Sequence, residues 1–192
     1  VAKWTGSQWI QVGDLSGTPT ALTVHEGKLI AVGGIRVGSG PIQNNVIQWD
    51  GQNWQTLGAG FDAGPQAVTV FEGRLVVGGD FQNSGGTPVA RVAQWNGSAW
   101  MPMGSGFSYG ACMDLAVFSG ELFACGTFES SGANQVSRVA RWNGAEWVGL
   151  DGGMTSRVSA LLPAQGHLFA FGDFYRAGAN GACRRRCPGA RS

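Results

Sequence analysis

The sequence predicts an all-β protein, a β-propeller of about four four-stranded blades, and three observations predict it. All eight tryptophans fall into four pairs with one internal spacing: Trp4/Trp9, Trp49/Trp54, Trp95/Trp100 and Trp142/Trp147. The first members of these pairs lie 45, 46 and 47 residues apart, a period typical of propeller blades. Between the pairs, short apolar segments with strand-like alternation are separated by glycine-rich turns.

The composition favours a packed β protein. Glycine supplies 33 of the 192 residues, charged residues make up 13% of the chain and apolar residues 43%, whereas a disordered chain carries more charge and fewer apolar groups. The net charge of +1 provides no overall attraction to nucleic acid. The longest apolar runs are too short to span a membrane. We therefore expect neither a nucleic-acid partner nor membrane insertion.

Each repeat contains four segments that we expect to form strands, named a, b, c and d. Strand a alternates and ends at a glycine turn, at residues 21–24, 67–71, 115–118 and 160–162. Strand b is apolar and ends at a glycine, at residues 29–34, 75–79, 122–126 and 168–172. Strand c carries the first tryptophan, at residues 46–49, 89–95 and 136–142. Strand d carries the second, after Asp-Gly or Asn-Gly turns that suit tight hairpins.

The order of these strands along residues 1–180 leaves the number of blades open. The chain begins with strands c and d (1–14), continues through three full repeats (15–58, 59–104 and 105–151), and then has strands a and b (152–180). The two ends could pair to close a four-bladed ring, which would remove exposed sheet edges. The chain could instead be a segment of a larger propeller in a longer parent chain, or form a homo-oligomer.

Residues 181–192 depart from the repeat. Pro188 stands where the pattern places a tryptophan, and Cys183 and Cys187 bracket three arginines. Proline is unfavourable in a paired strand. We expect a basic, disordered tail here and no further blade.

Two resemblances follow from the repeat residues. The doublets Gly33-Gly34 and Gly78-Gly79, followed by paired aromatic residues, resemble the kelch-type repeat, the class that includes the galactose oxidase propeller. This chain has two tryptophans where kelch repeats usually have a tyrosine and a tryptophan. The segments 79–97 and 126–144 are more similar to glycine-rich repeats of secreted or surface bacterial proteins. That resemblance implies an extracellular or cell-surface location and a role in binding or adhesion.

The sequence contains no arrangement typical of a catalytic or metal site. His25 and His167 are the only histidines, and neither has the further ligands that a zinc site needs or a neighbouring nucleophile. We expect no catalytic residue, no metal and no cofactor. Cys125 is expected to face Asp114 across strands a and b and Cys112 to face Thr127, which leaves a disulfide and two buried thiols both open. The tryptophan pairs are expected to pack between blades.

Connection lengths predict which face binds. The a–b and c–d turns are short, whereas the b–c and d–a connections are long and should meet on one face of the propeller, where recognition residues accumulate. The contact residues expected there are Arg36, Gln43, Asp62, Asp80, Asn83, Tyr109, Glu129, Asn134, Asp173, Tyr175 and Arg176.

The sequence thus favours a non-enzymatic binding or scaffold module that recognises a protein or a glycan. One alternative is a propeller segment that scaffolds a catalytic domain of a longer secreted protein. A second is a structural repeat without a small-molecule ligand. A third is an enzyme whose loop carboxylates converge on the central channel.

Overall fold

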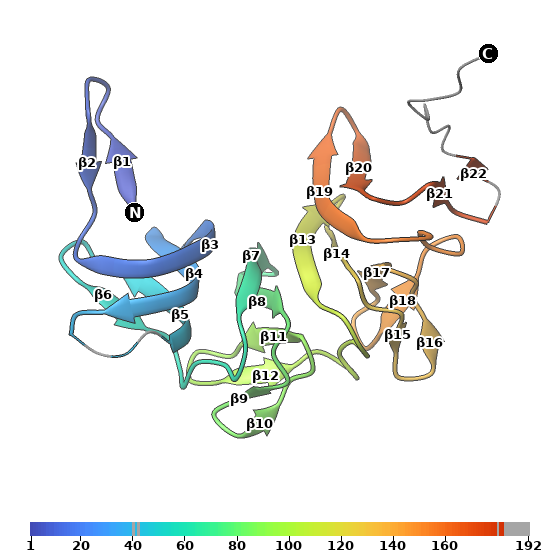
Figure 1. Cartoon of the computed structure of the whole chain (residues 1–192), viewed down its shortest axis with the longest axis horizontal. Helices are drawn as coiled ribbons and strands as arrows, with labels where there is room; N and C mark the ends of the chain where they lie inside the picture. The colour runs from blue at the N-terminus through green and yellow to red at the C-terminus, as the bar shows by residue number, and fades with distance from the viewer. Residues whose placement is uncertain (40, 42, 180, 183–192) are drawn as a thin grey trace, which may run out of the picture.

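The computed structural model describes residues 1–39, 41, 43–179 and 181–182, and every regular element in them is a β-strand. Figure 1 shows the strands gathered into antiparallel sheets that follow one another along the chain. The chain therefore has an all-β fold of repeated sheets.

Three sheets have four strands each. Within each sheet, neighbouring strands follow one another along the chain, apart from the small hairpins inserted between some of them. The first sheet is formed by β3 (Leu15–His25), β4 (Lys28–Val37), β5 (Gln43–Trp49) and β6 (Trp54–Thr56). The second is formed by β7 (Pro65–Phe71), β8 (Arg74–Gly79), β11 (Val92–Trp95) and β12 (Trp100–Pro102). The third is formed by β13 (Cys112–Phe118), β14 (Glu121–Gly126), β17 (Val139–Trp142) and β18 (Trp147–Gly149).

Two hairpins flank these sheets, and three shorter ones lie in or after the connections. The N-terminal hairpin is β1 (Ala2–Trp4) with β2 (Trp9–Gln11), and the C-terminal hairpin is β19 (Val158–Ala164) with β20 (His167–Gly172). The shorter hairpins are β9 (Asn83–Ser84) with β10 (Thr87–Pro88), β15 (Ser130–Ser131) with β16 (Asn134–Gln135), and β21 (Arg176–Ala177) with β22 (Gly181–Ala182). Residues 183–192 of the expected tail lie outside the described residues.

The expected order of strands a to d is confirmed, although several strand limits differ from those expected. Strand c of the second and third sheets begins at Val92 and Val139, later than predicted. Ala90 and Arg91, like their counterparts Ser137 and Arg138, have positive φ and turn the chain before the strand starts. The long b–c connections of these sheets are also partly ordered, because each contains one of the short hairpins.

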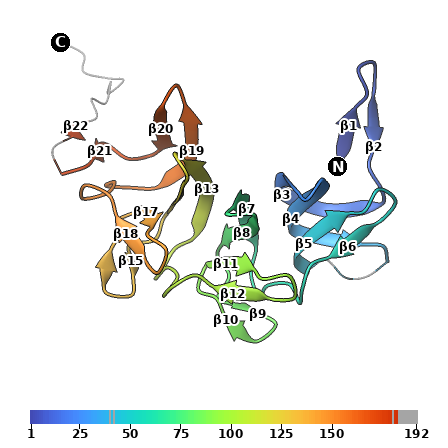
Figure 2. The same cartoon turned by 180° about the vertical axis from the view of Figure 1, so that it is seen from behind.

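The sheets form an open arc. The first strands of successive units (β3, β7, β13 and β19) lie against one another and line the concave side in both views (Figures 1 and 2). The N-terminal and C-terminal hairpins lie on opposite sides of the opening. Each is a separate two-stranded sheet, so the described residues of the two ends do not pair with each other as a closed ring of four sheets would require.

Tryptophan pairs hold successive units together. Each pair lies directly opposite across its hairpin, for example Trp49 with Trp54, whose ring centroids are 5.3 Å apart. The buried Trp54 donates its indole N–H to the Val12 carbonyl of the preceding unit at 2.9 Å, and Trp100 repeats this contact to Leu57 at 3.0 Å. The packing role expected for the tryptophans is thus confirmed for the three internal pairs.

A glycine beneath the rings permits this contact. A Cβ atom on Gly58 would lie 2.9 Å from the Trp95 ring and 3.0 Å from the Trp100 ring, closer than a real Cβ approaches. The residue also has a φ of +73°, which favours glycine. The joint between the first and second sheets therefore needs glycine at this position.

Candidate binding face

A repeated latch ties the d–a connections to the b–c connections on the long-loop face. Its members are Asp62, Ser108 and Thr155, which are 46 and 47 residues apart. The backbone N–H of each donates to a carbonyl of the following b–c loop, at 3.1 Å to Asn83, 2.9 Å to Ser130 and 3.3 Å to Arg176. Three different side chains therefore occupy one structural position.

The side chain of each latch residue completes the exchange. Asn83, Ser130 and Arg176 donate their backbone N–H groups back to the latch oxygens, at 3.0, 3.2 and 3.1 Å respectively. Asp62 also accepts from the Gln82 backbone at 2.8 Å and from the Asn83 side chain at 2.7 Å. Partial desolvation opposes ionisation of Asp62, but these hydrogen bonds outweigh it and lower the pKa of the carboxyl group.

Two arginines at equivalent positions also bind the d–a connections, those before β13 and β19. Arg91 donates to the Phe107 carbonyl at 2.8 Å and to the Gly110 carbonyl at 2.5 Å. Its counterpart Arg138 donates to the Met154 carbonyl at 3.4 Å and forms an ion pair with Glu129 at 3.0 Å. Each arginine thus connects one unit to the loop that leads into the next.

Tyr109 stands out from this framework. The connection between β12 and β13, which carries it, is one residue longer than the corresponding connections from β6 to β7 and from β18 to β19. Tyr109 has a positive φ of 48°, which is uncommon for a tyrosine, and it is 79% exposed. Ser108 on one side is latched and Gly110 on the other is clamped by Arg91. A fixed loop therefore holds this aromatic ring in solvent.

Several other expected contact residues are engaged within the chain. Asn83 bonds to Asp62, and Glu129 pairs with Arg138. Asn134 donates to Glu146 and to the Trp147 carbonyl, both at 3.0 Å. These side chains shape the loops.

The remaining expected contacts are distributed among the units. Asp173 pairs with Arg157 at 2.9 Å. Arg36 and Gln43 lie within the paired strands β4 and β5 of the first sheet. Asp80 follows β8, Tyr175 lies between β20 and β21, and Arg176 begins β21; all three are exposed. Of the two exposed tyrosines, Tyr109 is the more exposed.

The organising roles of four residues were not predicted from the sequence: Ser108, Thr155, Arg91 and Arg138. The repeat spacing that aligns the tryptophans also aligns these positions, so an alignment of the repeats would identify them as equivalent. Most of their hydrogen-bond partners are backbone carbonyls and N–H groups, which leave no trace in the sequence.

Asp114 is a further residue whose role was missed. It occupies the place of Ala21, Ala67 and Ala160 after the bulge in strand a. Its carboxylate accepts from the Leu161 N–H at 2.7 Å, across the joint to the C-terminal hairpin, and from its neighbour Leu115 at 2.9 Å. Burial raises the pKa of this carboxyl group, and the two hydrogen bonds only partly oppose that effect.

The two cysteines of the third sheet are free and buried. Cys125 faces Asp114 as expected, but Cys112 faces Gly126 and not Thr127, because a bulge shifts the register between Cys112 and Asp114. Burial raises the pKa of both thiols well above the ordinary value. Neither thiol is a ready nucleophile at neutral pH.

Among the residues that the structure describes, no three histidine, cysteine, aspartate or glutamate side chains come together as a ligand set for a metal ion. Nor does the described part of the chain contain a helical segment with the length and apolarity needed to cross a bilayer.

Comparison with known proteins adds no family to these findings: no family model matches the sequence, and no curated protein matches it.

Proposed function

We propose that the chain is a kelch-like β-propeller segment that acts as a non-enzymatic binding module outside the cell or at its surface. Its long-loop face would recognise a protein or a glycan. The architecture supports the propeller assignment, because four-stranded units succeed one another with their first strands innermost. The cellular location rests on the resemblance to repeats of secreted and surface proteins.

The single observation that carries the binding proposal is the presentation of Tyr109. An aromatic side chain that is 79% exposed is available for contact with a partner. The latched and clamped loop lowers the conformational entropy that binding would cost. Tyrosine gives a large contact area with a hydroxyl group for hydrogen bonding, which suits both protein surfaces and sugar rings.

The placement of the two histidines favours binding over catalysis. His25 ends β3 and His167 begins β20, so both lie at short a–b turns and not in the long loops that carry Tyr109. The His25 ring bonds to the Gly73 carbonyl and the His167 ring to the Gln165 carbonyl, both at 2.9 Å. The residue type most often used as a general base is therefore held away from the proposed face.

The test compares two variants in a screen against immobilised glycans and extracellular protein fragments. Tyr109→Ala should weaken binding to the ligand found by more than about tenfold, the loss of one aromatic contact of about 1.4 kcal/mol. Met101→Ala is the matched control, because Met101 is an exposed apolar residue on β12, outside the long loops. Equal affinity of Tyr109→Ala and the wild type would contradict the proposal. A screen without any ligand would favour a purely structural repeat.

A further inference from the structure

The two ends of the chain carry complementary halves of one repeat. The N-terminal hairpin β1–β2 has the tryptophan pair of strands c and d but no strands a and b beside it. The C-terminal hairpin β19–β20 corresponds to strands a and b, and among the residues that the structure describes no strand pairs with β20 along its outer edge. In the three complete sheets that edge is occupied by a strand c.

Exposed apolar side chains concentrate at these two ends. Ten large hydrophobic side chains are exposed in the described residues, and seven of them lie on the terminal hairpins or on β3, beside the N-terminal hairpin: Trp4, Trp9, Leu22, Val24, Leu162, Phe169 and Phe171. Trp9 is 69% exposed, whereas its counterparts Trp54, Trp100 and Trp147 are buried. The ends therefore expose surfaces that the internal joints cover.

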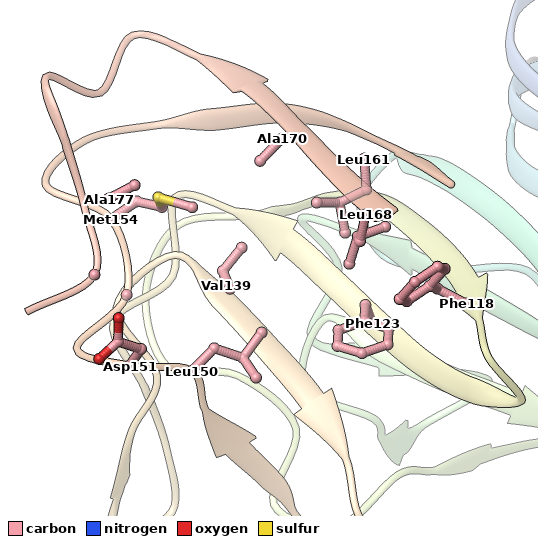
Figure 3. A pocket seen from close by; sticks show the side chains of 12 residues that line it. Phe118, Phe123, Val139, Leu150, Asp151, Met154, Leu161, Leu168, Ala170 and Ala177 are labelled. Atoms are coloured by element: carbon pink, nitrogen blue, oxygen red, sulfur yellow. The ribbon is translucent and has the colours of Figure 1, made fainter. Parts of the chain in front are cut away.

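A cavity lies at the C-terminal end, where strands c and d would complete the sheet of β19–β20. It has a volume of about 410 Å³ and lies between the third sheet and the C-terminal hairpin. Figure 3 shows Leu161 and Leu168 of the hairpin directed toward Phe118 and Phe123 of the third sheet. At the two preceding joints the corresponding apolar cluster contains a strand d tryptophan, Trp100 or Trp147. The cluster at this joint contains none.

The outer face of β20 is also uncovered. Strands β8 and β14, its counterparts, are buried along almost their whole length, whereas burial in β20 alternates. Phe169 corresponds to the buried Val76 and Phe123, yet it is 50% exposed, and Phe171 is 74% exposed. In the complete sheets this face packs against strand a of the following unit.

We propose that β1–β2 of a second copy of this chain completes the C-terminal hairpin as a composite four-stranded sheet. Leu29 pairs with Trp49 in the first sheet, and by the same register Trp4 of the second copy would face Leu168. Trp9 of the second copy would then enter the cavity. Phe169 and Phe171 would pack against Leu22 and Val24 of the second copy, so one joint covers both sets of exposed side chains.

A second copy is the occupant that fits the arc. The two ends of one chain lie on opposite sides of the opening (Figures 1 and 2), so β1–β2 of the same chain does not lie beside β20. A head-to-tail contact of this kind closes into a ring when the rotation permits. Each copy supplies three complete sheets and two halves. Two copies joined twice would form eight sheets, within the range of about four to eight blades found in propellers.

Asp151 is a residue in which this joint departs from the internal joints. It takes the position of Gly13 and Gly58 before the cavity, with a φ of +41°. It lines the rim of the cavity, as Figure 3 shows, and its carboxylate lies close to Gly178. In the composite sheet, the Asp151 side chain must therefore stay at the rim so that the Trp9 indole of the second copy can enter the cavity.

The test uses one variant at each end of the full chain, measured by sedimentation equilibrium. Trp9→Ala removes the entering ring, and Phe171→Asp places a carboxylate in the receiving face. Both residues are exposed in the single chain, so both variants should keep the wild-type melting profile of the monomer. Met101→Asp, on the exposed part of β12, is the control for a change of surface charge.

The wild type and Met101→Asp should form a dimer of twice the 20.0 kDa chain mass. Each end variant alone should weaken this association by more than about tenfold. An equimolar mixture of the two end variants should recover a 1:1 dimer, because one joint then has an intact Trp9 and an intact Phe171.

Three results would overturn the proposal. The first is a wild type that remains monomeric at all concentrations. This result counts against the proposal also when the two ends of one chain pair with each other and cover Trp9. The second is association that neither variant weakens. The third is a mixture that stays monomeric.

Discussion

Asp62, Ser108 and Thr155 perform one task with three side chains. Each exchanges a pair of hydrogen bonds with the backbone of the following loop, and only the aspartate brings a charge. Charge-assisted hydrogen bonds are stronger than neutral ones. The latch before β7 should therefore depend on pH, whereas those before β13 and β19 should not.

Acid should weaken the Asp62 latch in a way that its amide variant does not share. The pKa of Asp62 is lowered in the folded chain, so its contribution to stability is complete above the unfolded pKa of about 3.9. That contribution is lost as pH falls through the lower folded value. In thermal melts between about pH 6 and pH 2.5, Asp62→Asn should show a shallower decrease in Tm than the wild type. Asp80→Asn serves as the control, and identical slopes for Asp62→Asn and wild type would refute the charge effect.

The strand d tryptophans explain how one element holds the next. Trp54 and Trp100 donate their indole N–H groups to the preceding unit. The Nε1 of Trp147 is buried without an acceptor among the described residues. A buried donor without a partner costs free energy, so the same residue type stabilises the joints unequally.

Replacing these rings by phenylalanine separates the hydrogen bond from the packing. Trp54→Phe removes a buried hydrogen bond and leaves the Val12 carbonyl without its donor, whereas Trp147→Phe removes an unpaired donor. The free energy of unfolding should therefore decrease by about 1 kcal/mol more for Trp54→Phe than for Trp147→Phe. Urea denaturation measures the difference, and Trp100→Phe should behave like Trp54→Phe. An equal or larger loss for Trp147→Phe would show that the hydrogen bond does not set the difference.

The order of elements could be predicted because the tryptophan period and the glycine turns repeat along the sequence. The start of strand c could not, because Ala90 and Arg91 turn the chain with positive φ and are not typical turn residues. The register of Cys112 was missed for a related reason: a bulge adds a residue without a sequence signal.

Some features of the candidate site could also be predicted from the sequence, and others could not. The long loops and the exposure of Tyr109 follow from connection lengths and were predictable. The engagement of Asn83, Glu129 and Asn134 in bonds within the chain depends on which loops meet in space. A single sequence does not contain that information.

At the scale of the whole molecule, successive units of the arc pack against one another, and the last of these contacts, between the third sheet and the C-terminal hairpin, lacks a tryptophan. The internal joints bury a tryptophan against the preceding unit, and the terminal joint leaves a cavity in its place. The long-loop face and the chain ends use different residues, so the proposed ligand binding through Tyr109 and the proposed association through Trp9 can each fail without the other.

Hydrogen exchange along β20 tests the composite sheet most directly. In the complete sheets, β8 and β14 are paired on both edges, whereas within the part of the chain that the structure describes β20 is paired with β19 alone. At high protein concentration the outer-edge amides of β20 should become as protected as those of β8 and β14. Dilution, or the substitution Trp9→Ala, should remove that protection. Fast exchange of the outer-edge β20 amides at every concentration, while β8 and β14 remain protected, would contradict it.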